Sequence, residues 1–130
     1  MKKTSVKTEL GKLTPRFFQI KGKKQYGYDK VKVFSAKEFG VKGAKYQIVS
    51  LPANASVPPH FHRKVTELFL VQAGKGKIEV NSKEFKAKAG DIFLIQKGDF
   101  HALSNPFKKP FVIHVFKWNE EEKDINWLRR

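Results

Sequence analysis

The chain has 130 residues, of which 40% are hydrophobic and 30% charged; this is enough apolar surface for one domain and excludes a wholly disordered chain. It contains 0 Cys, which excludes disulfides and thiolate metal sites, so that any metal ion needs nitrogen and oxygen ligands. The net charge of +15 at pH 7 favours anionic partners, but most of the basic residues are Lys spread along the chain, whereas proteins that read DNA sequence rely on Arg.

Residues 1–30 are predicted to form a basic, partly flexible N-terminal segment. Nine Lys or Arg stand here against Glu9 and Asp29, and the only apolar cluster lies in residues 15–20, where we expect an extended stretch. Charge is the one feature of this segment that favours nucleic acid, and without a nucleic-acid-binding motif we do not expect nucleic acid as a partner. No apolar signal-peptide core and no run of about 18 apolar residues follows, so we expect a cytoplasmic protein without membrane contact.

Residues 31–130 are predicted to form one all-β domain. Short runs of β-forming residues alternate with turn residues, which is typical of a sandwich or barrel. Asn81 and Ser82 separate two alternating runs and predict a hairpin. We expect strands over residues 31–33, 46–49, 67–72, 77–80, 83–88, 91–95 and 111–116.

The C-terminal residues have the pattern of a short helix. Asn119 is a good N-cap residue, and Glu122 follows three positions later, as in a capping box. The basic residues 129–130 suit the negative end of a helix dipole. We therefore expect a short C-terminal helix that packs on the barrel, with Trp118 and Trp127 assigned to that packing.

Four residues form a candidate metal-binding set. His60 and His62 are two positions apart, so on an extended strand both side chains point to the same face. Glu67 shares its predicted strand face with apolar residues, and a carboxylate buried alone would be costly. His101 follows a later strand that could return to the same point. Taken singly, the histidine pair could be incidental, Glu67 could sit in a buried ion pair and His101 could cap a turn.

The spacing of these residues resembles the two sequence motifs of the cupin superfamily. The first motif, G-x5-H-x-H-x3–4-E-x6-G, is matched from Asn54 to Gly74, with Asn in place of the first Gly. The second, G-x5-P-x-G-x2-H-x3-N, is matched from Gly90 to Asn105, with Gln96 in place of Pro. Asn tolerates the left-handed conformation that Gly would supply, and no ligand position is altered.

The resemblance implies an antiparallel jelly-roll β-barrel and a metal ion near its wider end. It implies that the ion is held by a 3-His/1-Glu site of His60, His62, Glu67 and His101, and that the protein is a homodimer. Such a set leaves open coordination positions and suits one divalent ion of Fe, Mn, Ni, Co or Zn. The function that the resemblance implies is that of a metal-binding cupin. We expect a small enzyme that acts on an anionic small molecule by oxygenase, isomerase or lyase chemistry. The alternative is a non-catalytic ligand-binding or sensor cupin.

The sequence leaves open the role of His114 and the orientation of residues 46 and 47. His114 is either a packed core or interface residue or a group beside the metal that holds a proton. Tyr46 and Gln47 alternate, so one of the two should face the barrel interior. Gln72 is predicted to point away from the strand face that carries Glu67.

Overall fold

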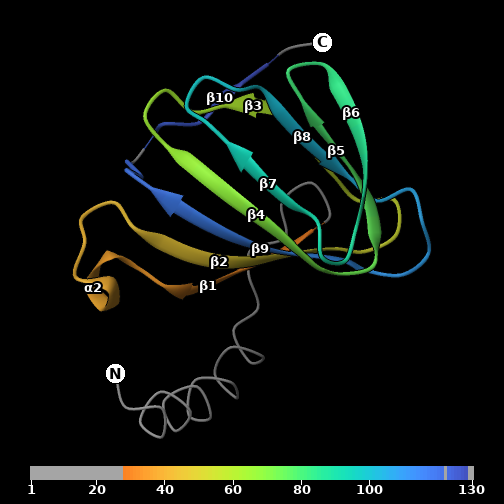
Figure 1. Cartoon of the computed structure of the whole chain (residues 1–130), viewed down its shortest axis with the longest axis horizontal. Coiled ribbons are helices and arrows are strands. Elements are labelled where there is room, and N and C mark those ends of the chain that lie inside the picture. The colour runs from red at the N-terminus through yellow and green to blue at the C-terminus, as the bar shows by residue number, and fades with distance from the viewer. Residues whose placement is uncertain (1–27, 122, 129–130) are drawn as a thin grey trace, which may run out of the picture.

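The computed structural model describes residues 28–121 and 123–128. Most of the predicted basic segment, including the stretch at 15–20, lies outside these residues. Within them, ten strands form two five-stranded antiparallel sheets that face each other (Figure 1). This arrangement agrees with the predicted all-β jelly-roll class.

Each sheet combines strands from both halves of the chain. The first sheet has the order β1 (Asp29–Phe34), β2 (Lys45–Leu51), β9 (Phe111–Trp118), β4 (Thr66–Ala73) and β7 (Ile92–Ile95). The second has the order β10 (Asn126–Trp127), β3 (Ser56–Phe61), β8 (His101–Ser104), β5 (Lys75–Val80) and β6 (Lys83–Lys88). Apart from the consecutive pairs β1–β2 and β5–β6, neighbouring strands are not consecutive along the chain, so the two halves of the sequence are interleaved.

The local turn signals are confirmed by the backbone. Asn81 and Ser82 have φ of 50° and 70°, as expected for the primed turn of a tight hairpin. Asn54 has φ of 67°, so Asn does adopt the left-handed conformation at the position where the motif has Gly. The backbone N–H of Gln96 donates to Asp99 Oδ2 over 2.9 Å, a hydrogen bond that a proline at this position would lack.

Two strands next to the motif histidines were not predicted. β3 contains Pro58 and Pro59, and its register with β8 shifts between Val57 and His60. Proline is tolerated in a strand at such an irregularity because no ladder hydrogen bond is required of its nitrogen. β8 has only four residues, and His101 is its first.

The predicted C-terminal helix is wrong: residues 119–121 and 123–128 contain no helix. Asn119 has φ of 60°, whereas a helix N-cap residue is extended. Further on, Asn126 and Trp127 pair with Phe61 and His60 as strand β10. Tertiary pairing with the sheet edge therefore overrides a local capping pattern whose energy is about 1 kcal/mol.

A short helix occurs elsewhere, as α2 (Ala36–Phe39). It was not predicted, although Ser35 and Glu38 form its capping box and Gly40 ends it in the left-handed conformation. Among the residues that the structure describes, no helix has the length and apolar character needed to cross a membrane.

On the inner face of the first sheet, the side chains are apolar at one end of the strands and polar at the other. On β9, Phe111, Ile113 and Val115 are buried in the core, and Lys117 follows on the same face. On β4, buried Phe69 and Val71 share their face with Glu67, and on β2 the buried Val49 and Leu51 share theirs with Gln47. Lys117 is the register partner of Glu67. The apolar core thus fills one end of the fold, and polar side chains gather at the other.

Candidate metal centre

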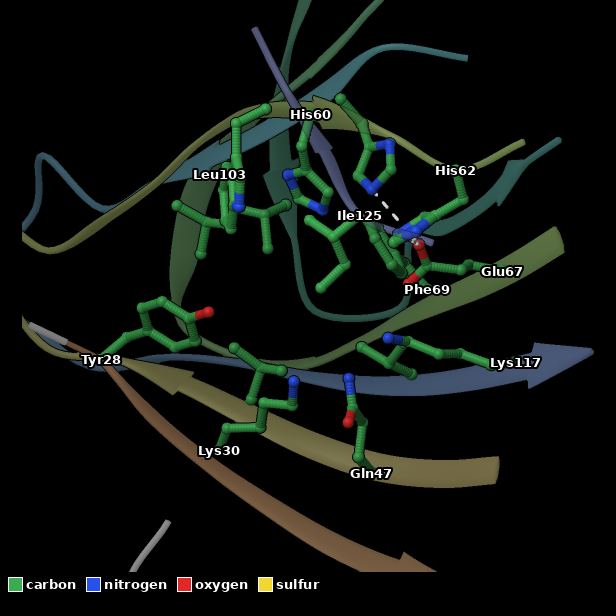
Figure 2. A pocket seen from close by; sticks show the side chains of 15 residues that line it. Tyr28, Lys30, Gln47, His60, His62, Glu67, Phe69, Leu103, Lys117 and Ile125 are labelled. Carbon is green, nitrogen blue, oxygen red and sulfur yellow. Dashed lines mark ion pairs between the residues drawn. The ribbon is translucent and has the colours of Figure 1, made fainter. Parts of the chain in front are cut away.

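The structure brings the three motif histidines together at this polar end (Figure 2). His60 lies in β3 and is the register partner of His101 in β8, and His62 comes just after β3. Glu67 reaches the same place from β4 in the facing sheet. One ring nitrogen of each histidine lies within 4.8 Å of the others, which is close enough for three imidazoles to bind one ion.

Main-chain carbonyls orient all three rings. A carbonyl can only accept a hydrogen bond, so each Nδ1 in contact with one carries the proton and donates it. A neutral ring then has its lone pair on Nε2, which in His62 and His101 is the atom that contacts Glu67. The acceptors are the carbonyl oxygens of Pro58 for His60 at 3.0 Å, of Asp99 for His101 at 3.0 Å and of Asp124 for His62 at 2.5 Å.

The converging atoms lack hydrogen-bond partners of their own. Glu67 Oε1 lies 2.8 Å from His62 Nε2 and 3.2 Å from His101 Nε2. In the Nδ1–H form these are contacts between lone pairs, and all three atoms are buried without a hydrogen-bond partner. Such a group is costly unless a proton or a cation lies between the atoms. Nitrogen and carboxylate donors of this kind fit a divalent transition-metal ion.

The surroundings favour the protonation state that metal binding requires at His60 and at Glu67, and oppose it at His62. Burial, together with the charge of His101, lowers the pKa of His60 to about 4. Burial alone would raise the pKa of Glu67, but the contacts with His101 and His62 and the charge of Lys117 hold it well below its usual range. For His62, burial lowers the pKa, but the close contact with the Glu67 carboxylate and its negative charge outweigh burial and raise the pKa. A metal ion at this position would compete with a proton for His62.

The polar end encloses a cavity of about 70 Å³. A single buried water needs roughly 10–15 Å³ by the same measure, so there is room for a few waters or a small organic molecule. Sequence reasoning missed most of the cavity wall. Trp127 was assigned to helix packing, but its ring centroid lies 4.8 Å from that of His60. The other missed lining residues include Tyr28, Lys30, Lys117 and Ile125.

His114 does not belong to this centre. It lies on the outer face of the first sheet, where its two ring nitrogens contact the Tyr46 hydroxyl and the Gln72 amide oxygen. The possibility of a group beside the metal is therefore wrong for His114. Gln72 points away from the cavity as predicted, and the open choice at 46–47 is resolved, because Gln47 is buried in the cavity wall.

Lys30 allows a measurement of what a buried charge in the cavity wall costs in free energy of unfolding. Burial, reinforced by Lys117 and Lys45, lowers its pKa from 10.5 to about 8. Below pH 8 the ammonium is charged in both folded and unfolded chains, and the folded chain bears the whole cost of burying it. Lys30→Met is therefore expected to raise the free energy of unfolding at pH 7 by on the order of 1 kcal/mol, after allowance for solvent screening.

The gain from Lys30→Met should shrink as the pH rises above 8 and vanish near 10.5, because the wild-type amine is then neutral in both states. Urea denaturation of both proteins between pH 7 and pH 10.5 measures the difference. Lys32→Met is the control, since it removes an exposed lysine from the same strand. A destabilising effect of Lys30→Met at pH 7 would contradict the expectation.

Two facing antiparallel sheets with a histidine-lined cavity at one end define a class of small-molecule-binding β-barrels. The family model for the cupin domain matches residues 47–117, more than half of the chain. The chain belongs to the cupin superfamily.

Two curated proteins match about half of the chain. An oxalate-binding protein of Thermotoga maritima is 30% identical over 64 residues, which are 49% of this chain and 53% of the relative. An uncharacterized protein of Aquifex aeolicus is 30% identical over 66 residues, 51% of this chain and 54% of the relative. The chain thus spans about half the length of the curated relatives it matches.

Solved structures share the fold at low sequence identity. A predicted oxalate decarboxylase from Thermotoga maritima superposes with a TM-score of 0.65 at 22% identity, covering 78% of this chain and 81% of that chain. The polyketide cyclase RemF from Streptomyces resistomycificus gives a TM-score of 0.70 at 16% identity, covering 85% and 78%. Since such different proteins share this fold, the fold alone does not define an activity.

Proposed function

We propose that the chain binds one divalent transition-metal ion through His60, His62, Glu67 and His101 and acts on a small organic anion at that ion. One observation carries the proposal: the Nε2 atoms of buried His62 and His101 converge on Glu67 Oε1 with no hydrogen-bond partner. An ion at this point would relieve the contacts between lone pairs and take all four ligands at once.

The chain's own residues would then have separate roles. His60, His62 and His101 offer Nε2, because their Nδ1 protons are donated to carbonyls. Glu67 brings the carboxylate and compensates part of the metal charge. A bound ion would supply a Lewis acid with coordination positions left for the substrate. Trp127 and Ile125 cover the histidine side of the cavity and limit its access to water. Oxygenase, isomerase and lyase chemistry are all compatible with this ligand set.

A second candidate is a metal-dependent binding protein without catalysis. It is supported by the relative from Thermotoga maritima, which is named an oxalate-binding protein. The two candidates share the metal and the anionic ligand and differ only in the fate of that ligand. Recovery of the ligand unchanged would favour binding alone.

The test begins with the metal content of the purified full chain, measured by elemental mass spectrometry. We expect close to one transition-metal ion per chain, with iron directing assays toward oxygenation and manganese, nickel or zinc toward isomerase or lyase chemistry. The loaded protein is then incubated with small carboxylates, including oxalate, and the products are identified by mass spectrometry. No metal after reconstitution with each of the five ions would overturn the proposal.

A barrel domain over 31–130, a homodimer and a cytoplasmic location stay predictions of the sequence. Analytical ultracentrifugation of the full chain addresses the homodimer directly.

A further inference from the structure

We propose that Lys30 and Lys117 form an anion-binding wall across the cavity from the histidines, and that the ligand is a small dicarboxylate with one carboxylate at the metal and the other at this wall. The inference rests on the proposed function, because it takes the metal position as the first anchor. It goes further by naming the second anchor and the ligand class that two anchors in a small cavity select.

The placement of the two lysines follows from the sheet. Lys30 comes from β1 and Lys117 from β9, and both line the same cavity as His60, His62 and His101. Figure 2 shows the lysine ammonium groups on the floor of the cavity, with His60 on the opposite side. A ligand between the two walls would contact both.

The charges of the wall are only partly compensated within the protein. The ammonium of Lys117 is held 3.5 Å from Glu120, but the same carboxylate lies 3.2 Å from Lys45. The side chain of Lys30 makes no hydrogen bond or ion pair with residues 28–121 or 123–128. Glu67 is the one acidic residue among the described residues that line the cavity, and a bound metal ion would take up its charge. Glu121 and Asp124 lie with the same lysines around an adjoining hollow, but Glu121 pairs with Lys64, and Asp124 accepts hydrogen bonds from the backbone N–H groups of Arg63 and Lys64. The cavity is therefore short of negative charge, which an anionic ligand would supply.

Gln47 adds a polar side chain to the lysine side of the cavity. Its side chain is 4% exposed and lines the cavity, and its Oε1 atom has no hydrogen-bond partner. The amide points toward the lysines in Figure 2. The unpartnered Oε1 is an acceptor and would need a donor, whereas the N–H₂ end of the amide is the donor that suits a carboxylate oxygen next to Lys30.

The size of the cavity limits the ligand. About 70 Å³ accommodates a few waters and hence a short acid. Lysine carries a compact point charge, which suits a carboxylate as well as a phosphate, but the small space favours the smaller group. A ligand that reaches the anchors on both walls of so small a cavity must therefore carry two acidic groups joined by few atoms.

The test is isothermal titration calorimetry of the metal-loaded full chain with oxalate as the dianionic probe and oxamate as its monoanionic isostere. We expect the wild type to prefer oxalate, and Lys30→Gln to weaken oxalate binding by about tenfold or more while affecting oxamate less. Lys30→Arg keeps the charge and should retain most of the affinity. Lys32→Gln removes the same charge from an exposed position on β1 and should change the affinity by no more than about twofold.

Failure of this inference is distinguishable from failure of the proposed function. Metal content is measured first on each variant and should be unchanged, which also verifies that each variant is folded. Absence of metal from the wild type would overturn the metal site itself. Full metal content with equal affinity of wild type and Lys30→Gln for oxalate, or with no preference for oxalate over oxamate, would overturn the anion wall alone.

Discussion

The double variant His60→Ala/His101→Ala is expected to retain little metal under conditions in which the wild type holds close to one ion per chain. The two substitutions remove half of the proposed ligand set, including the two rings that are register partners between β3 and β8. Loss of a group that merely supports a ligand already costs about 10- to 100-fold in metal affinity, so loss of two ligands should cost more. Elemental mass spectrometry after extensive dialysis measures the result.

His114→Ala is the matched control for the metal experiment. It removes the same type of side chain from the outer face of the first sheet, where the imidazole contacts Tyr46 and Gln72. We expect full metal content in this variant. Metal retained by the double variant, or lost equally from His114→Ala, would mean that the ion binds elsewhere. Circular dichroism of each variant distinguishes loss of ligands from loss of fold.

Gly74→Ala is expected to destabilise the fold by roughly 3 kcal/mol or more. Gly74 joins β4 to β5 with φ of +77°, and a Cβ atom there would lie 2.1 Å from the carbonyl oxygen of Pro110. The obstacle is main chain just before β9, which cannot turn aside as the end of a flexible side chain could. The substitution therefore combines an unfavourable backbone conformation with a steric clash.

Gly98→Ala separates these two effects. Gly98 has φ of +87°, but a Cβ atom there would meet nothing within 4 Å. We expect this variant to lose only about 1–2 kcal/mol, the cost of the left-handed conformation for a residue with a side chain. Urea denaturation gives both free energies of unfolding. Equal losses at the two positions would show that the close approach to Pro110 is relieved by a small shift of the backbone.

The convergence of the three histidines with Glu67 and most strands were predictable because the information for them is local. His60 and His62 share a face through simple strand alternation, and the spacing from Asn54 to Gly74 and from Gly90 to Asn105 carries the family resemblance. The strand at Asn126–Trp127 was not predictable in this way, since it exists through pairing with β3.

The same reason explains the missed cavity wall. Lys30 lies outside both motifs, and a lysine in an alternating run looks like an ordinary exposed residue until a neighbouring strand covers it. Trp127 reaches His60 only because the end of the chain folds back along β3. The sequence did predict that either residue 46 or Gln47 faces the interior, because the two alternate. It could not show which of them does, because that depends on which face of β2 packs against the core.

The three main-chain carbonyls that hold the imidazoles make the donor geometry insensitive to the side chains around it. Whatever residue stands at position 58, 99 or 124 still presents a carbonyl oxygen, so the hydrogen bond that turns each ring is encoded by the path of the backbone. A sequence can drift at these positions and keep its nitrogen lone pairs aimed at one point. Similar histidine sites should therefore be sought by comparing backbone paths around paired histidines, because the identities of the residues that supply the carbonyls are poor guides.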